Sequence, residues 1–110
     1  MSRGRYIIRP KADQDLDNQA FYYSTQANEE LGYRFLVAAH DTFGLLAEQP
    51  EMGWIPKFRN AGLRGLRAFR VTGFEKILIL YRPLENGLEV LRVIHSSRNI
   101  QRLIRREDID

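Results

Sequence analysis

The stretch EKILILYRPLENGLEVLRVIH, residues 75–95, decides the fold of this chain. Its first part, 77–81, is apolar at every position, and a strand that is apolar on both faces is typical of the centre of a sheet. Asn86 and Gly87 follow, and this dipeptide between apolar runs is the strongest short signal for a β-hairpin. The apolar pattern then resumes over 88–95. We therefore predict two antiparallel strands joined by a tight turn.

Another strand is predicted just before this hairpin. Residues 66–71 have the period of two that a strand requires, with Arg67 and Phe69 on one face and Ala68 and Arg70 on the other. This strand would extend the hairpin into a small sheet.

The N-terminal part predicts a short strand followed by a helix. Residues 6–8 form a β-branched run, which is ended by Pro10. Proline suits the first turn of a helix, because its missing N–H would have no partner there. Leu16, Ala20 and Tyr23 then recur at the spacing of one helical face. We expect this face to pack on the sheet.

A second helix is predicted between a cap and a proline. Asn28 can accept a hydrogen bond from the first turn, and Pro50 cannot continue a helix. The residues predicted to face inward are Leu31, Phe35, Ala38, Thr42 and Leu45. Residues 51–63 lose the pattern and predict a loop. The two helices, joined by a few residues, would form an αα-hairpin.

After the last strand we predict a short basic helix. It would begin at Ser96 or Ser97, with an apolar side and a cationic side. The apolar residues are Ile100, Leu103 and Ile104, and the basic ones are Arg98, Arg102, Arg105 and Arg106. The predicted fold is therefore a single α+β domain over 1–110, of order β-α-α-β-β-β plus this helix. A small antiparallel sheet would carry the helical hairpin on one face.

The second face of the central strand is a predicted contact site. Only the short terminal helix is available to cover residues 77–81 on that side. Because burial of apolar surface is worth about 25 cal/mol per Å², a bare apolar face favours association. We expect a second protein to cover part of it.

Composition limits the class of protein. The chain has 110 residues, 44% of them apolar and 28% charged, which suits one globular domain. It has no cysteine, so a disulfide scaffold and thiolate metal sites are excluded. No apolar run is long enough for a membrane span, and no signal-peptide core follows Met1. These features lead us to expect a cytoplasmic protein.

The net charge of +3 hides a strong asymmetry. Residues 1–55 carry five basic and eight acidic side chains, which gives −3. Residues 56–110 carry twelve basic and six acidic ones, which gives +6. A basic half is typical of proteins that meet nucleic acid, a nucleic-acid-bound enzyme or an acidic protein. A merely well-solvated basic surface is the alternative.

Several strings in this order resemble the ParE branch of the RelE/ParE toxin superfamily of bacterial type II toxin–antitoxin systems. The helix pair contains Ala12-x-x-Asp15-Leu16 with Tyr23 beyond it, and then LAEQPEMG at 46–53. The sheet contains Leu66-Arg67, EKILILYR at 75–82 and RVIHSSRN at 92–99. Each string alone is weak, but their order and spacing span about residues 6–100.

The resemblance implies a toxin that a co-expressed antitoxin neutralises. It also implies that the target is DNA gyrase and that the pair takes part in plasmid stabilisation. The antitoxin of such a pair lays a helix and an extended segment across the toxin. The residues assigned to antitoxin binding are Trp54, Arg67, Arg70, Leu78 and Leu80. The residues assigned to the target, in the segment after the last strand, are His95, Arg98, Arg102, Arg105 and Arg106. Asn99 stands where many relatives have aspartate, which puts a local arginine–aspartate pair in doubt.

The RelE branch cuts mRNA on the ribosome and supplies the alternative function. Cleavage by a 2′-hydroxyl needs a proton acceptor, a proton donor and cations near one phosphate. The candidates for these roles are Arg67, Arg70, Arg82 and His95. The ribosome-dependent nucleases often end the sheet with a tyrosine, whereas Ser96 and Ser97 follow His95 here. Binding to gyrase needs no such set, and the sequence favours it. A non-toxic protein-binding module is the third reading.

Some polar residues have simpler interpretations. His40 lies among alanines and is expected to be partly buried, while His95 suits a hydrogen-bonded structural role. Trp54 can cap the core, and Arg92 is expected to pair with Glu75 or Glu89. The sequence has no phosphate-binding glycine loop and no plausible zinc set, so we expect no cofactor and no metal. A membrane partner is not expected, and self-association is left open.

Overall fold

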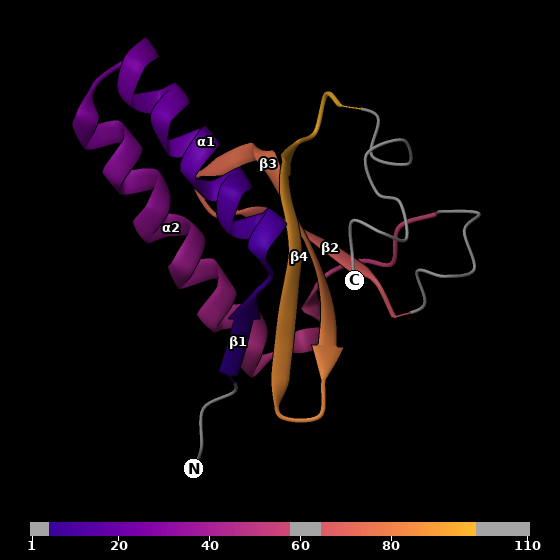
Figure 1. Cartoon of the computed structure of the whole chain (residues 1–110). Helices are drawn as coiled ribbons and strands as arrows, with labels where there is room; N and C mark the ends of the chain where they lie inside the picture. The colour runs from indigo at the N-terminus through magenta and orange to yellow at the C-terminus, as the bar shows by residue number, and fades with distance from the viewer. Residues whose placement is uncertain (1–4, 58–64, 99–110) are drawn as a thin grey trace.

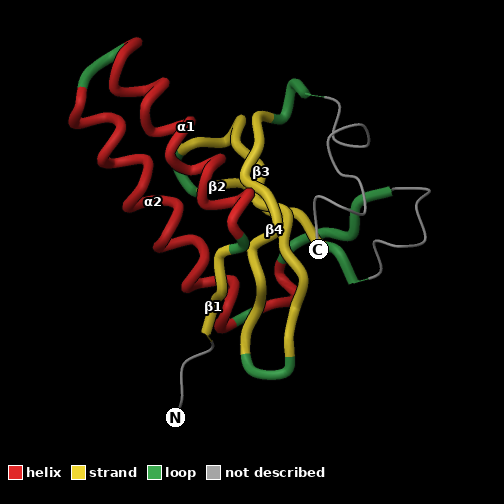
Figure 2. The backbone as a smooth tube through the Cα atoms, viewed as in Figure 1, coloured by secondary structure: helices red, strands yellow, loops and turns green. Residues whose placement is uncertain are grey.

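A computed structural model describes residues 5–57 and 65–98, which form a helical hairpin packed on one face of a four-stranded sheet (Figures 1 and 2). The elements are β1 (Arg5–Ile8), α1 (Pro10–Gln26), α2 (Glu29–Glu48), the 3-10 turn η1 (Pro50–Met52), β2 (Arg67–Val71), β3 (Phe74–Leu84) and β4 (Gly87–His95). The α+β class and the predicted element order are confirmed.

The sheet has the strand order β1-β4-β3-β2. β3 pairs antiparallel with both β2 and β4, as the sequence predicts for its central strand. β1 pairs in parallel with β4, so the sheet is mixed rather than wholly antiparallel. The two strands are not consecutive, and no hairpin turn fixes their relative direction, so no local pattern in the sequence indicates this pairing.

The β3–β4 hairpin is longer than its apolar pattern indicates. The turn residues are Glu85 and Asn86, because Leu84 already pairs with Gly87. Gly87 has a φ of 154°, and a Cβ there would clash with the backbone of Arg5 in β1. Glycine is therefore needed at this position to let β1 pass close to the start of β4.

The helix boundaries follow the predicted signals. α1 begins at Pro10, and α2 is capped by Asn28, whose Oδ1 accepts a hydrogen bond from the backbone N–H of Leu31 at 2.8 Å. α2 ends just before Pro50. These signals are local in sequence, which is why they locate the helices well.

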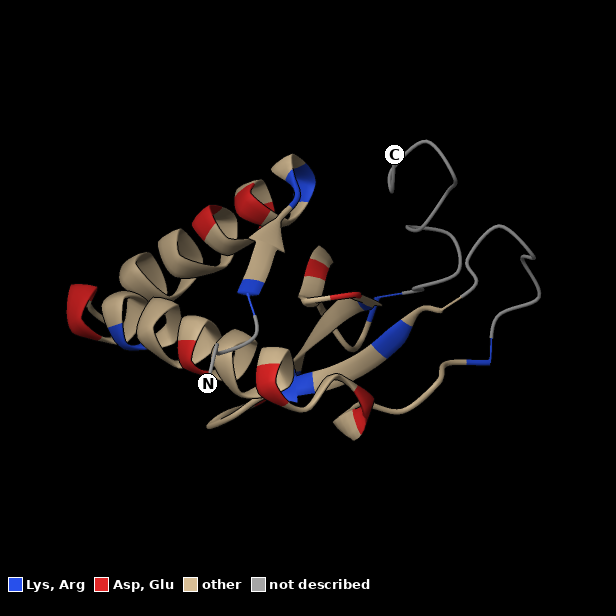
Figure 3. Ribbon diagram, turned by 90° about the horizontal axis from the view of Figure 1, so that it is seen from below, with Lys and Arg blue, Asp and Glu red and all other residues tan. Residues whose placement is uncertain are grey.

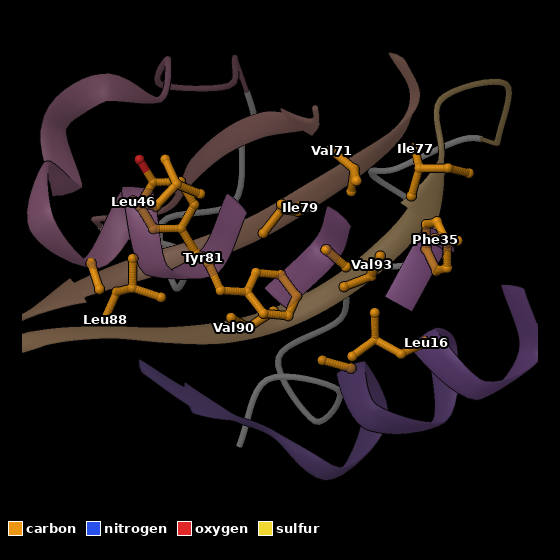
Figure 4. Packing of buried hydrophobic residues seen from close by; sticks show 14 residues of the cluster. Leu16, Phe35, Leu46, Val71, Ile77, Ile79, Tyr81, Leu88, Val90 and Val93 are labelled. Carbon is orange, nitrogen blue, oxygen red and sulfur yellow. The ribbon is translucent and has the colours of Figure 1, made fainter. Parts of the chain in front are cut away.

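The core lies between the helices and the sheet, and Figure 4 shows its side chains. The fully inward residues of α2 are Gly32, Phe35, Ala39, Thr42, Phe43, Leu46 and Ala47. The predicted inward face is therefore only partly right. Leu45 is 40% exposed, and Leu31 and Ala38 are only half-buried. The helix has apolar residues around most of its circumference, so two adjacent stripes fit the same spacing.

The second face of the sheet is less open than predicted. Leu78 and Leu80 of β3 point away from the helices but keep only 6% and 1% of their surface exposed. In register, Leu80 lies between Ala68 of β2 and Arg92 of β4. The expectation of a bare apolar face is wrong for these two side chains.

Two predictions concern the ends of the chain and its relation to membranes. Residues 96–98 form a turn, and the predicted basic helix beyond them, with Asn99, Arg102, Arg105 and Arg106, lies outside the described residues. In the described ranges, neither helix combines the length and apolar character that crossing a membrane requires.

Candidate protein-binding surface

Trp54 and Arg70 form an exposed stack on the edge of the sheet. Trp54 exchanges two backbone hydrogen bonds with Ala68 of the edge strand β2, at 2.9 and 2.8 Å. The guanidinium carbon of Arg70 lies 5.0 Å from the centre of the Trp54 ring, the geometry of a cation–π contact. Trp54 is 40% exposed. We call Trp54 and Arg70 the edge stack.

The loop that carries Trp54 is held from inside the fold by Tyr81. The hydroxyl of Tyr81 donates a hydrogen bond to the carbonyl of Pro50 at 2.6 Å and accepts one from the N–H of Gly53 at 2.9 Å. Gly53 lies so close to Tyr81 that a Cβ would clash with the hydroxyl. Tyr81 itself is fully buried, so it anchors the loop and is not open to a substrate (Figure 4).

Arg67 holds the same loop. Its Nη1 donates to the carbonyl of Gly53 at 2.7 Å and to that of Glu51 at 3.2 Å. Arg67 lies opposite Tyr81 in the strand register. The two side chains act together, and we call Tyr81 and Arg67 the loop clamp. The predicted site residue Arg67 therefore faces the protein's own backbone.

Burial favours the neutral form of the Tyr81 phenol in the loop clamp. Burial raises the pKa of the Tyr81 phenol above its ordinary value, while the hydrogen bond from Gly53 and the charge of Arg67 partly oppose this. The neutral phenol is the form that donates to the Pro50 carbonyl. The clamp therefore stays intact at neutral pH.

A hollow of about 810 Å³ opens beside the clamp, between the end of α2 and the end of β3. Its lining consists of 48–52, Gly65, Arg67, Pro83 and Leu84. Prolines, Met52 and Leu84 supply apolar walls, and Glu48 and Glu51 supply carboxylates. Such a mixed lining suits side chains of a protein segment.

The remaining predicted basic residues lie elsewhere on the sheet. Arg82 pairs with Glu89 across the β3–β4 hairpin, and its Nε donates to Oε1 at 2.8 Å. His95 is half-buried at the end of β4, where its Nδ1 accepts from the N–H of Ser97 at 3.1 Å and lies 2.7 Å from the Ser97 hydroxyl oxygen. Nδ1 is therefore an acceptor, and a neutral ring carries its proton on Nε2.

The sheet register does not bring the candidate nuclease residues together. His95 pairs with Ile77, five positions before Arg82 on β3, and five residues of a strand span about 17 Å. Arg67 and Arg70 are three positions apart on β2, so they point to opposite faces of the sheet. One phosphate could not contact all four side chains in this arrangement.

Two polar residues have other partners than predicted. Arg92 pairs with Asp15 of α1, not with Glu75 or Glu89, and its Nε donates to Oδ2 at 2.7 Å. Glu89 is engaged by Arg82 instead. His40 is exposed rather than partly buried, and its Nδ1 lies 3.0 Å from the hydroxyl of Tyr6 in β1.

Sequence reasoning missed the loop clamp and the hollow. In the sequence Tyr81 is only an available residue of the middle strand, and no local pattern links it to Gly53, which is 28 positions away. The described segments contain no group of three or more His, Asp or Glu residues that could hold a metal ion.

The chain matches the family described as ParE toxin of type II toxin-antitoxin system, parDE, over residues 6–100. Because this match covers most of the sequence, the chain belongs to that family of type II toxins. A solved chain from the chromosomal ParDE TA system of P. aeruginosa has a similar fold, with a TM-score of 0.68. The match covers 84% of this chain and 96% of that one at 15% identity, which supports the fold alone. Among curated proteins, none matches this sequence.

Proposed function

We propose that this chain is the toxin of a type II pair, that a cognate antitoxin neutralises it, and that it inhibits DNA gyrase by binding. Membership of the ParE toxin family supports the toxin role. The similar solved chain comes from a ParDE TA system, which supports an antitoxin partner here as well. The chain would act in the cytoplasm, where gyrase and DNA are found.

The observation that favours binding over RNA cleavage is the sheet register. Acid–base cleavage requires its proton-transfer groups and cations around one phosphate. His95 and Arg82 lie about 17 Å apart along the sheet, and Arg67 is occupied by loop carbonyls. A toxin that traps another enzyme requires only a complementary surface. The ribosome-dependent nuclease is the alternative that a supercoiling assay distinguishes.

The proposed contact with gyrase begins where β4 ends. His95 and Arg98 lie there, and Arg98 is exposed. Arg102, Arg105 and Arg106 follow in sequence outside the described residues. Guanidinium groups suit carboxylate and phosphate surfaces through paired hydrogen bonds.

The proposed contact with the antitoxin is the sheet face that points away from the helices, with the edge stack as its accessible part. The stack offers an apolar ring and a cation side by side, so an antitoxin segment with apolar and acidic residues fits it. Leu78 and Leu80 lie on the same face but are already buried, so they offer an antitoxin little accessible surface. Arg67 would contribute through the loop that it holds.

A supercoiling assay tests the proposal. The purified chain should block gyrase supercoiling or cause cleaved plasmid to accumulate. Arg98→Glu with Arg102→Glu should lower this inhibition at least tenfold, because both cations are reversed. The matched control, Arg5→Glu with Lys11→Glu, changes charge equally near the start of the chain and should inhibit as the unaltered chain does. Unaffected gyrase, together with cut mRNA on added ribosomes, would contradict the proposal.

A separate assay tests the antitoxin surface. Trp54→Ala and Arg70→Glu should each weaken antitoxin binding at least tenfold in a titration, without loss of gyrase inhibition. The control is Lys11→Glu, an exposed cation on α1 and not on that sheet face. Unchanged antitoxin affinity in both variants would place the antitoxin elsewhere while leaving the proposal about gyrase untouched.

A further inference from the structure

The outward side of α2 exposes large apolar side chains that the fold does not use. Tyr33 is 69% exposed, Val37 42% and Leu45 40%. The inward side is already filled by Phe35, Phe43 and other buried residues. Single exposed apolar residues are common on protein surfaces, but here three lie along one side of one helix, in a strip that Asp41 interrupts between Val37 and Leu45. We call this strip, with the residues between its members, the outer α2 face.

One cation and one anion flank the centre of the outer α2 face. Arg34 and Asp41 are both exposed and seven residues apart. Seven residues are two helical turns, so both point the same way, and they are separated by a rise of about 10.5 Å. That separation is far beyond ion-pair distance, so they cannot neutralise each other within one helix. Val37 lies between them.

The spacing of these two charges is self-complementary. If two copies of α2 pack antiparallel about a two-fold axis at the midpoint of Arg34 and Asp41, each arginine faces the aspartate of the second copy. Val37 of each copy then lies next to the axis. Such an isologous contact forms both ion pairs at once.

The glycine of this face provides room for the contact. A Cβ at Gly44 would meet nothing within 4 Å, so the space outside the helix is open. In the antiparallel arrangement Gly44 lies close to the level of Tyr33 from the second copy. The exposed ring can lie across the glycine, and a close approach of the two helices follows.

We propose that the outer α2 face is a self-association surface, on which a second copy of this chain docks with its own α2 antiparallel. The face lies opposite the buried residues of α2, and the helices and the sheet form separate layers (Figure 1), so the contact leaves the edge stack free. It spans at most the 20 residues of α2, about 30 Å. A strip of that length and of one helix width, about 10 Å, covers roughly 300 Å². That area is small compared with about 800 Å² per partner in a standard interface, so the dimer is weak and concentration-dependent.

A basic segment of another protein is the competing occupant. Glu30, Asp41 and Glu48 outnumber Arg34 on this side of the helix. A basic partner, however, would gain nothing from Arg34, whereas a second copy pairs both charges reciprocally. The two occupants therefore respond differently to charge exchange.

Sedimentation velocity of the full-length chain, over a dilution series up to about 1 mM, tests the proposal. The unaltered chain should show a concentration-dependent shift from monomer to dimer. Arg34→Asp and Asp41→Arg should each weaken self-association at least tenfold, because each places two like charges opposite each other. An equimolar mixture of the two variants should regain the association, because one variant supplies two anions and the other two cations.

The control is Asp17→Arg, which makes the same charge change on α1 and should dimerise as the unaltered chain does. Circular dichroism should show all variants folded, because every altered residue is exposed. A chain that remains monomeric throughout the series would overturn the proposal. So would a mixture that associates no better than either variant alone.

Discussion

At the scale of single residues, Asp15 completes an edge of the sheet that strand pairing leaves open. β1 ends at Ile8, opposite Val90, so β4 continues without a neighbour on that side. Asp15 of α1 reaches this edge and accepts a hydrogen bond from the N–H of Val93 at 3.0 Å. Its two oxygens also accept from Arg92 at 2.7 and 3.1 Å. One carboxylate thus joins α1 to β4.

Replacing this carboxylate should be costly. Both side chains of the Asp15–Arg92 pair are largely buried, and breaking a buried pair by removing one partner costs about 3–5 kcal/mol. We expect Asp15→Ala to lower the free energy of unfolding by about that amount in urea titrations. Asp15→Asn keeps an acceptor for the N–H of Val93, so its free energy of unfolding should fall clearly less than that of Asp15→Ala. Equal stability of the alanine variant and the unaltered chain would show that the pair contributes nothing.

Gly87 marks the closest approach between β1 and β4. Gly87→Ala should lower the free energy of unfolding by at least about 3 kcal/mol, because the added Cβ clashes with Arg5 backbone and the φ of 154° is strained. Gly73→Ala is the matched control, since Gly73 also has a positive φ, of 87°, but nothing lies near its Cβ. The Gly73→Ala variant should lose only about 1–2 kcal/mol of unfolding free energy. Equal losses in the two variants would contradict the close approach.

At the scale of elements, the loop clamp couples β3 to the segment that carries Trp54. Tyr81→Phe removes the hydroxyl, which leaves the N–H of Gly53 without its acceptor, at a cost of about 1–3 kcal/mol. We expect this variant to be less stable by that amount in thermal unfolding. It should also lose part of its antitoxin affinity, because the edge stack is no longer held in place. The Tyr22→Phe variant, altered at an exposed tyrosine, should match the unaltered chain in both measurements.

The clamp also predicts a pH dependence. The pKa of Tyr81 is raised in the folded chain, mainly by burial, so folding favours the neutral phenol. An unfolded tyrosine ionises at about pH 10. The stabilisation is therefore complete below about pH 10 and is lost as the pH rises through the folded pKa. The difference in unfolding free energy between the unaltered chain and Tyr81→Phe should shrink above pH 10. A constant difference up to the alkaline limit would argue against a buried phenol.

The elements were predictable where their signals are local. The Asn28 cap, Pro10 and Pro50 locate both helices, and the apolar stretch at 77–81 locates the central strand. The inward face of α2 was harder to predict, because a neighbouring stripe has the same period. Contacts between residues that are far apart in the sequence could not be predicted. The pairing of β1 with β4 and the ion pair between Asp15 and Arg92 depend on the whole fold.

At the scale of the whole molecule, charge is divided between the layers. The segment from Pro10 to Glu48 holds seven acidic and two basic residues, whereas basic residues predominate on the sheet side (Figure 3). Residues 56–110 sum to +6. This division fits a toxin whose sheet side meets acidic or phosphate-bearing partners while its helical layer does not.

The candidate site was only partly predictable from sequence. The sequence supplies candidate residues by their chemistry, but strand register and side-chain partners decide which of them are accessible. Arg70 and Trp54 are exposed, while Arg67 and Arg82 are held by loop carbonyls and by Glu89. Pairing is a property of the folded sheet, so it could not be read from the order of the arginines.

Binding to gyrase, rather than cleavage of RNA, is tested most directly by the damage in cells that express the chain without an antitoxin. Gyrase covalently trapped on chromosomal DNA and cuts in ribosome-bound mRNA would be measured in the same culture. We predict trapped gyrase and intact mRNA soon after induction, with both kinds of damage absent when the antitoxin is co-expressed. Cut mRNA with no trapped gyrase would contradict the proposed function.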